Sequence, residues 1–203
     1  MAREFFGTDG IRGRVGAHPM TAEFALRLAS AAARVLAPNG GRVCIGKDTR
    51  VSGYMFESAL EAGFVAAGMD VLLLGVLPTP GIAQATQAHG ADLGVVISAS
   101  HNLFFDNGIK FFDANGAKLP DAVEEHIEAF LVEPAITRDS SELGRAKRVE
   151  SAREDYQRFC LGTVPADMRL QDLKLVIDCS HGADYKVAPR VISELGAEIV
   201  PIG

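Results

Sequence analysis

The chain has 203 residues, 48% hydrophobic and 23% charged, which is typical of a globular protein with length for one large or two small domains. Its net charge of −6 includes no basic block, so we do not expect nucleic acid as a partner. No apolar run approaches a membrane span and the amino-terminal stretch has no signal-peptide core, which predicts a cytoplasmic protein without membrane association. The odd number of cysteines, with Cys44 and Cys179 inside expected strands, predicts reduced thiols.

The chain opens with a glycine-rich stretch, Phe5–Gly13, in which three glycines recur at a spacing of three around Thr8 and Asp9. This pattern fits neither a regular helix nor a good strand, and glycine is used where the backbone bends sharply or approaches a ligand. With Arg12 and Arg14 beside it, the loop could present N–H groups and guanidinium groups to an anion. A plain amino-terminal turn is the alternative, and these residues alone do not decide between the two.

Helical and extended patterns then alternate along the chain. The apolar periodicity predicts a helix from the N-cap Thr21 to about Pro38, a strand at 42–46, a helix at 52–68, a strand at 71–74 and a helix at 82–88. This order predicts an α/β fold, with a doubly wound, mainly parallel or mixed sheet and helices on both faces. The loop after the first of these strands carries two cations, Lys47 and Arg50.

One stretch concentrates the polar chemistry. The β-branched run Val95–Ile97 predicts a buried strand, and it ends abruptly at Ser98-Ala99-Ser100-His101-Asn102. We expect a turn at Asp106-Asn107-Gly108 and a return strand at 109–112, which brings Lys110 within reach of the serine. Ligands of α/β sheets bind in the loops that leave the carboxyl ends of strands. A serine, a histidine and a lysine brought together there suit phosphate handling.

The second half of the chain repeats the pattern of the first. A turn at Asn115-Gly116 precedes a predicted helix with Asp121 and Glu124 in capping-box positions. Residues 136–150 lack periodicity and predict a linker between a domain at 1–135 and a second α/β domain at 151–203. That second domain shows a strand at 173–178, a helix marked by Ala188, Val191, Ile192 and Leu195, and a strand at 198–203. Because two strands alone cannot bury both faces of a sheet, we expect the second domain to be truncated.

Several chemistries could use this serine. Ser100 beside His101 suggests a hydrolase, but adjacent residues rarely align as nucleophile and base, and the G-x-S-x-G elbow is absent. Walker A and strand-linked G-x-G-x-x-G patterns are also absent, as are HExxH, cysteine pairs and clustered carboxylates. Taken singly, Ser100 could cap a turn and His101 could be a satisfied polar side chain. If loops 7–14, 46–53 and 98–108 share one sheet edge, they form a cationic, donor-rich bowl around a serine that can carry a phosphoryl group.

Several long motifs, in the same order, resemble the amino-terminal part of the α-D-phosphohexomutase superfamily. They are FGTDGIRG (6–13), SGYMFESALEAGF (52–64), PTP (78–80), VISASHN with DNGIKFF (96–112), and VIDCSHGA (176–183). Within the superfamily the chain is most similar to the bacterial branch that acts on glucosamine phosphate. The resemblance spans essentially the whole chain but under half of a family member, which has four domains.

The resemblance implies an isomerase that interconverts glucosamine 6-phosphate and glucosamine 1-phosphate through a phosphoserine and a 1,6-bisphosphate, for amino-sugar nucleotide and peptidoglycan precursor synthesis. It implies Mg²⁺ bound by phosphorylated Ser100, with the remaining metal ligands beyond Gly203, and glucose- or glucosamine-1,6-bisphosphate as priming donor. A small phosphosugar is then the substrate and a homodimer the candidate assembly. Carried over position by position, the resemblance implies that the catalytic residues are Ser100, His101, Lys110 and Arg12. The loops of the predicted bowl supply the candidate substrate- and phosphate-binding residues, which are Thr8, Asp9, Arg14, Lys47, Arg50 and Asn102.

The chain departs from the family pattern in ways that keep alternatives open. Leu103 stands where the family usually has proline, which predicts a less rigid serine loop. The Asp-rich Mg²⁺ loop and the sugar- and phosphate-reading loops are absent, so these 203 residues alone are expected to be inactive. A phosphomannomutase or phosphoglucomutase of the same superfamily is one alternative. A binding fragment without activity, lacking the metal and sugar-reading domains, is the other.

Overall fold

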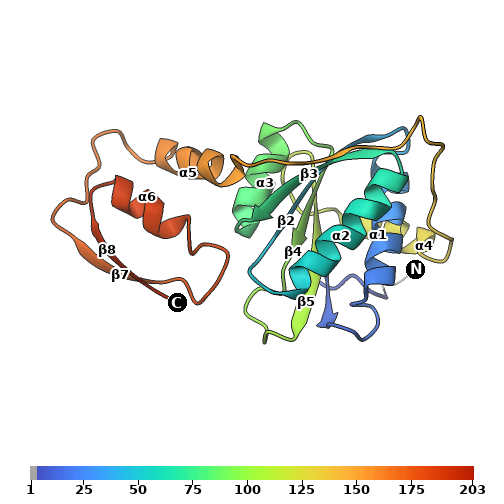
Figure 1. Ribbon diagram of the computed structural model, residues 1–203, viewed down its shortest axis with the longest axis horizontal. Helices are drawn as coiled ribbons and strands as arrows, with labels where there is room; N and C mark the ends of the chain where they lie inside the picture. The colour runs from blue at the N-terminus through green and yellow to red at the C-terminus, as the bar shows by residue number, and fades with distance from the viewer. Residues whose placement is uncertain (1–3) are drawn as a thin grey trace.

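The structure is a computed structural model that describes residues 4–203. Residues 1–3, which begin the first predicted domain and the stretch inspected for a signal peptide, lie outside the described residues. The described chain forms two lobes side by side in an elongated molecule (Figure 1). Within these residues, none of the helices has the length and apolar character needed to cross a membrane.

The larger lobe holds a six-stranded sheet and the smaller lobe a two-stranded one. In chain order the larger lobe contains β1 (Ile11–Arg14), α1 (Ala22–Leu36), β2 (Gly41–Lys47), α2 (Ser52–Ala66), β3 (Met69–Val76), α3 (Thr79–Ala88), β4 (Leu93–Ile97), β5 (Asp106–Asp113), α4 (Asp121–Phe130) and β6 (Ala146–Arg148). The rest of the chain contains α5 (Ala152–Gly162), β7 (Lys174–Asp178), α6 (Ala188–Glu194) and β8 (Glu198–Ile202).

The large sheet has the strand order β1-β5-β4-β2-β3-β6. β2 lies between β4 and β3 and runs parallel to both, and β6 adds parallel to β3. β5 runs antiparallel to both β4 and β1. The sheet is therefore mixed, and with helices on both faces it confirms the expected fold class. In the small lobe β7 and β8 pair in parallel.

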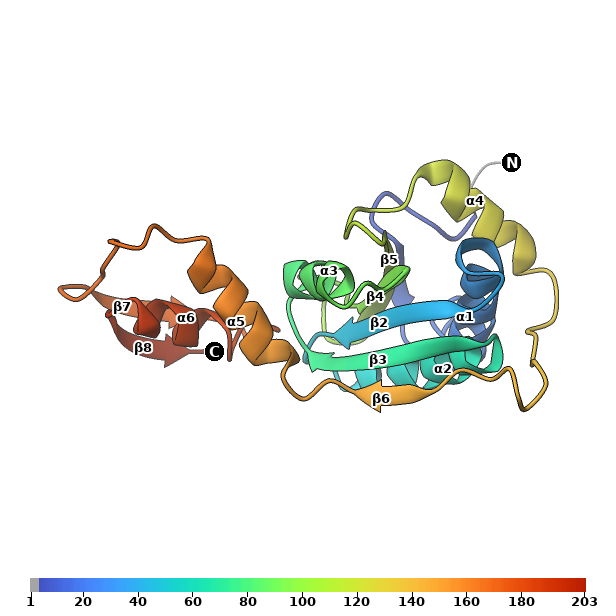
Figure 2. The same ribbon diagram turned by 90° about the horizontal axis from the view of Figure 1, so that it is seen from above.

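Both faces of the large sheet are buried, which explains why its central strands read as continuous apolar runs. In β2, Val43 and Ile45 belong to the core that packs against α1, α2 and α4, whereas Cys44 belongs to the core beneath α3 and α5. In β4, Val95 and Val96 divide between the two cores in the same way. Figure 2 shows the sheet between these layers. Successive side chains alternate across a strand, so one run supplies both cores.

The helices begin and pack largely as their sequences predict. The hydroxyl of Thr21 accepts a hydrogen bond from the Phe24 N–H at 3.2 Å, which confirms the expected N-cap of α1. α1 packs closely on α2 because Gly63 has no side chain, and a Cβ there would lie 2.5 Å from the Leu26 carbonyl oxygen. The capping box expected at Asp121 is wrong, because Pro120 is the N-cap of α4 and makes no side-chain cap bond.

The turn expected at 106–108 is also wrong. These residues are the first of β5, and the chain reverses earlier, over residues 98–105. Asn107 fits inside the strand because its buried side chain is satisfied there. Its Nδ2 donates to the Ser52 hydroxyl at 2.8 Å, and its Oδ1 accepts from the Gly108 N–H at 2.8 Å. A strong local turn signal was overridden by tertiary hydrogen bonds.

Three other segments differ from the sequence expectation. Part of the glycine-rich stretch forms β1, because β5 offers it an open edge to pair with. The segment predicted as a linker contains β6, which extends the large sheet. Helix α5 was not expected from the sequence. Ala152, Tyr156 and Cys160 recur at helical spacing and pack it against the core beneath α3. Cys179 follows β7 rather than lying inside it.

Candidate active site

A cleft of about 1070 Å³ opens at the carboxyl ends of the parallel strands. Its large-lobe wall comes from the loop after β2, the start of α3 and the serine loop, which we define as Ser98–Phe105. Its other wall is residues Ser180–Asp184, the small-lobe loop, which follows β7. Ligand sites of α/β sheets occur at this position in the fold.

Ser100 lies exposed at this cleft, on a strained piece of backbone. Its φ of 57° is in the left-handed region, which non-glycine residues rarely adopt. Its N–H donates to the Ser98 hydroxyl at 3.0 Å, and that hydroxyl donates to Asp48 at 2.7 Å. Ser100 Oγ lies 3.2 Å from His101 Nδ1. The left-handed turn thus brings two adjacent side chains together, contrary to the expectation that neighbours rarely align.

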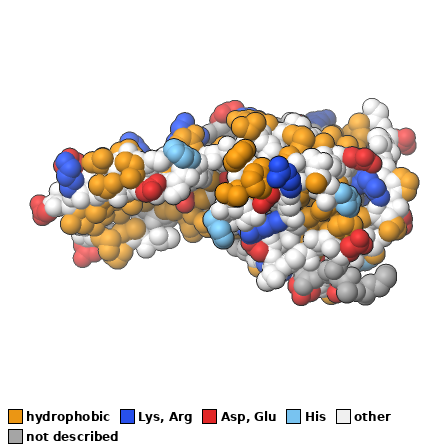
Figure 3. Space-filling view, turned by 90° about the horizontal axis from the view of Figure 1, so that it is seen from below, with side chains coloured by type: hydrophobic (Ala, Val, Ile, Leu, Met, Phe, Trp, Pro, Cys, Tyr) orange, Lys and Arg blue, Asp and Glu red, His pale blue; other side chains and the backbone are white. Residues whose placement is uncertain are grey.

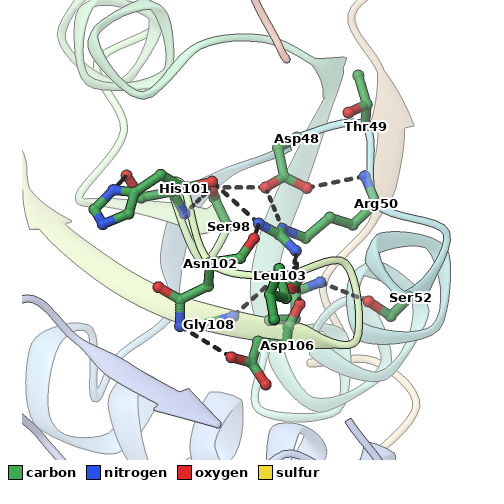
Figure 4. Close-up of polar contacts among 12 residues, drawn as sticks. Asp48, Thr49, Arg50, Ser52, Ser98, His101, Asn102, Leu103, Asp106 and Gly108 are labelled. Atoms are coloured by element: carbon green, nitrogen blue, oxygen red, sulfur yellow. Dashed lines mark hydrogen bonds and ion pairs between the residues drawn. The ribbon is translucent and has the colours of Figure 1, made fainter. Parts of the chain in front are cut away.

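Arg50 fixes the conformation of the serine loop by hydrogen bonds to its backbone carbonyls. Its Nε lies 3.0 Å from Asp48 Oδ2, and its two terminal nitrogens donate to four backbone carbonyls, those of Ser100, Asn102, Leu103 and Asp106. Figure 4 shows the guanidinium group enclosed by these oxygens. A guanidinium has five N–H groups, and all five are engaged here. Arg50, predicted to bind phosphate, therefore shapes the loop that presents Ser100.

Lys47 lies away from the cleft. Its side chain is 3% exposed, and its ammonium forms an ion pair with Glu57 of α2 beneath the Tyr54 ring. A buried lysine is tolerated when it is paired in this way. The structure therefore does not bring Lys47 to the other predicted phosphate-binding residues.

A second cationic cluster forms at β1 and β5. Asp9 lies 2.7 Å from Lys110 Nζ and also pairs with Arg12. Partial burial acts to raise the pKa of Asp9, but the hydrogen bond and charge of Lys110, with the charge of Arg12, outweigh it and lower that pKa. Thr8 lies at the same exposed turn. These four residues are not among those lining the cleft, so the predicted bowl divides into two parts.

The turn that carries Asp9 depends on glycine. The Gly7 N–H donates to the Gly10 carbonyl at 2.9 Å, which closes a tight loop around Thr8 and Asp9. Gly10 has a φ of 78°, and a Cβ there would lie 2.5 Å from the Ile109 carbonyl oxygen. The glycine pattern noted in the sequence is thus required for a close approach to β5.

Two more predicted residues line the cleft itself. The Arg14 guanidinium carbon lies 4.6 Å from the centre of the Phe105 ring, a cation–π contact. Asn102 donates to the Asp106 carboxylate at 3.0 Å and helps to close the serine loop. The sequence reasoning missed Asp48, Ser98 and the small-lobe loop. The Ser-His dipeptide in the small-lobe loop, which echoes that of the serine loop, was the available signal.

Gly203, beyond which the resemblance puts the remaining metal ligands, directly follows β8 in the small lobe. It is exposed and is not among the residues that line the cleft around Ser100. A Cβ at this position would lie 2.5 Å from Asp178 Oδ1, so the backbone of Gly203 packs against the end of β7. Gly203 has no side chain to offer a metal. It is therefore part of the small-lobe sheet edge rather than of the serine site.

The fold and the site together define an α/β domain with an exposed serine at the carboxyl edge of a mixed sheet. Residues 3–135 match the family model described as phosphoglucomutase/phosphomannomutase, alpha/beta/alpha domain I. The chain belongs to this family, and the resemblance to phosphohexomutases is confirmed.

The sequence similarity to curated proteins extends over the whole chain. The chain is 62% identical to a phosphoglucosamine mutase of Thioalkalivibrio sulfidiphilus, covering 100% of this chain and 45% of the relative. It is 57% identical to that of Pasteurella multocida, covering 99% and 46%. A putative phosphomannomutase structure from Thermus thermophilus aligns at 30% identity with a TM-score of 0.85, over 99% of this chain and 46% of that one. The chain thus spans under half the length of the curated relatives it matches.

Proposed function

We propose that this chain carries the reactive serine of an isomerase that interconverts glucosamine 6-phosphate and glucosamine 1-phosphate. The observation that carries the proposal is Ser100, whose hydroxyl is exposed at the cleft on a loop held by Arg50 and Asp48. The names of the relatives, phosphoglucosamine mutases 57% to 62% identical, support this hexose over glucose or mannose. A cytoplasmic location, a homodimer and a role in amino-sugar and peptidoglycan precursor supply belong to the same proposal.

The proposed reaction moves one phosphoryl group onto the sugar and another off it. In the first half, the bond between phosphorus and Ser100 Oγ breaks and the phosphoryl group joins the C1 hydroxyl oxygen, giving a 1,6-bisphosphate. The proton of that hydroxyl is released and Oγ takes up a proton. In the second half, the bisphosphate reorients, its 6-phosphate returns to Oγ, and glucosamine 1-phosphate leaves. His101 Nδ1, 3.2 Å from Oγ, is placed to exchange the proton with the serine.

At the cleft, charge stabilisation comes from Arg14, whose guanidinium lines the same space as Ser100. Lys110 and Arg12 are held by Asp9 in the separate cluster at β1 and β5, and their part in catalysis belongs to the same proposal. Phosphoryl transfer depends mainly on such positioning and charge. Mg²⁺ would neutralise developing charge in this chemistry. Residues 4–203 bring no group of three or more His, Cys, Asp or Glu side chains together to hold a metal, so they do not form the metal site and no step runs through it.

The proposal is tested by phosphoryl transfer to Ser100 within a protein of the relatives' full length, because these 203 residues alone are expected to be inactive. That protein is incubated with glucosamine 1,6-bisphosphate and Mg²⁺, then analysed by intact mass and peptide mapping. We expect one phosphoryl group, on the peptide that contains Ser100, and none on a Ser100→Ala variant. A phosphoryl group elsewhere, or equal uptake by that variant, contradicts the assignment.

The alternatives are separated by the acceptor sugar. Faster transfer from phosphorylated Ser100 to mannose 6-phosphate or glucose 6-phosphate than to glucosamine 6-phosphate would favour a phosphomannomutase or phosphoglucomutase. The isolated 203-residue chain, if it takes up no phosphoryl group from a bisphosphate donor, would behave as the binding fragment without activity.

A further inference from the structure

The packing of side chains does not fix the position of the reactive serine. Ser100 and His101 are both exposed, whereas Ser98 and Ala99 just before them are buried. Figure 3 shows histidine side chains at the surface of the molecule on the face seen from below. The position of Ser100 Oγ therefore depends on the conformation of the backbone that carries it.

That backbone forms a turn in which glycine is the usual residue. The Asn102 N–H donates to the Ala99 carbonyl at 3.1 Å, so Ser100 and His101 are the central residues of a four-residue turn. Ser100, the first of the two, has a φ of 57°. Turns with a positive φ at this position favour glycine, because a Cβ is unfavourable there. A serine can occupy the position only if neighbouring groups stabilise its left-handed backbone.

Two hydrogen bonds provide this stabilisation. The Ser100 N–H donates to Ser98 Oγ at 3.0 Å, and the Ser100 carbonyl accepts from Arg50 at 3.0 Å. Both partners contact the same oxygen, because Asp48 Oδ2 lies 2.7 Å from Ser98 Oγ and 3.0 Å from Arg50 Nε. Figure 4 shows Ser98 and Arg50 converging on Asp48. The loop after β2 thus holds both ends of the Ser100 backbone.

The Ser98 hydroxyl has one orientation in this arrangement. A carboxylate paired with a guanidinium accepts hydrogen bonds and donates none, so the Ser98 proton points to Asp48. A lone pair of Ser98 Oγ is then left for the Ser100 N–H. The Asp48 side chain is only 12% exposed, so water competes little for these bonds. Ser98 lines the cleft, but its hydroxyl is already engaged on both sides by the protein.

We propose that Ser98, oriented by Asp48, is a positioning residue for phosphoryl transfer at Ser100. The inference rests on the proposed function, because it concerns the same serine. The Ser98 hydroxyl stabilises the left-handed backbone of Ser100 and so keeps Ser100 Oγ at the cleft, 3.2 Å from His101 Nδ1. Ser98 acts through the backbone of Ser100 and not on the sugar phosphate. Phosphoryl transfer is sensitive to such positioning of the reacting atoms.

The test measures single-turnover transfer in a protein of the relatives' full length, because these 203 residues alone are expected to be inactive. Ser100 is phosphorylated to completion with glucosamine 1,6-bisphosphate and Mg²⁺, and transfer to saturating glucosamine 6-phosphate is then followed. We expect Ser98→Ala to lower the rate constant about tenfold, the effect of one hydrogen bond, with the dissociation constant of glucosamine 6-phosphate unchanged. Ser98→Thr, which keeps the hydroxyl, should restore the rate constant. A Ser98→Thr variant as slow as Ser98→Ala, or a weakened affinity in place of a slower transfer, would overturn the inference.

Ser151→Ala is the matched control. Ser151 donates to Asp155 at 2.7 Å at the start of α5, outside the cleft, so this variant removes the same kind of hydrogen bond. Partial unfolding of any variant would lower the amplitude of the single turnover and not its rate constant. Equal rate constants for Ser98→Ala and Ser151→Ala would overturn the inference and leave the proposed function standing. No transfer from Ser100 in the parent protein would overturn both.

Amide hydrogen exchange in the 203-residue chain tests the hydrogen bond itself. The Ser100 N–H should exchange about tenfold faster in Ser98→Ala than in the parent, and at the parent rate in Ser98→Thr. Equal exchange in Ser98→Ala and the parent would show that Ser98 does not hold the Ser100 backbone, and would overturn the inference independently of any activity.

Discussion

Replacing Arg50 with lysine tests whether its guanidinium organises the serine loop. Arg50 uses five N–H groups on four backbone carbonyls and on Asp48, whereas a lysine ammonium has three N–H groups in a compact head. The substitution keeps the charge and removes at least two charge-assisted hydrogen bonds. At about 1.5 kcal/mol for each bond, the closed loop loses about 3 kcal/mol relative to its open forms. The Arg50 side chain is only 11% exposed, so solvent offers little compensation.

The assay is amide hydrogen exchange, resolved by NMR, at loop N–H groups that donate inside the protein. They are the N–H groups of Ser98, Asn102 and Asp106. A loss of about 3 kcal/mol predicts roughly 100-fold faster exchange there, with α1 unchanged. Arg34→Lys, at a surface pair with Glu133, is the matched control. Loop amides that stay as protected in the Arg50 variant as in the parent would refute the reasoning.

Backbone strain, the amino-terminal clamp, the buried ion pair and the Asp9 cluster can each be tested by substitution. In urea titrations, the free energy of unfolding of Ser100→Gly should exceed that of Ser100→Ala by about 1 kcal/mol, because glycine relieves the φ of 57°. Neither variant is expected to take up a phosphoryl group. Equal free energies of unfolding would argue against backbone strain at this residue. The Glu128 carboxylate accepts hydrogen bonds from the three consecutive N–H groups of residues 4–6. Glu128→Gln should therefore lower the free energy of unfolding by about 2 kcal/mol in urea titrations. An unchanged free energy of unfolding would show that these hydrogen bonds do not contribute to stability. Glu57→Gln leaves Lys47 charged, buried and without its partner, so it should lower the free energy of unfolding by about 3–5 kcal/mol. The double variant Lys47→Met/Glu57→Leu should regain most of that free energy. A double variant no more stable than Glu57→Gln would contradict the ion-pair argument. The lowered pKa of Asp9 stabilises the folded state fully at pH values above the ordinary pKa of 3.8. The difference in free energy of unfolding between the parent and Asp9→Asn should therefore shrink as the pH falls through the folded-state pKa. A difference that stays constant as the pH is lowered would exclude this linkage.

Much of the fold could be predicted from the sequence because its signals are local. The apolar run Val95–Ile97 marks a strand buried on both faces, and Thr21 marks the start of α1. The serine loop could be placed at a strand end for the same reason. The domain division at 136–150 stays a prediction, although β6 within that segment joins the large sheet. Helix α5 was missed because its apolar stripe, Ala152, Tyr156 and Cys160, is short and lies among charged residues, and the core on which it packs comes from segments distant in the sequence, such as α3.

For the candidate site, the sequence identifies the residue types and the tertiary structure decides their roles. The sequence by itself determined which residue types are present: a serine and a histidine after a buried strand, with cations in neighbouring loops. Only the tertiary structure decided what those cations do. Lys47 and Arg50 stand three residues apart, yet one is buried against Glu57 and the other holds the serine loop. Their partners come from segments that only the folded sheet brings together, and a side chain's role is set by the charges and carbonyls it meets there.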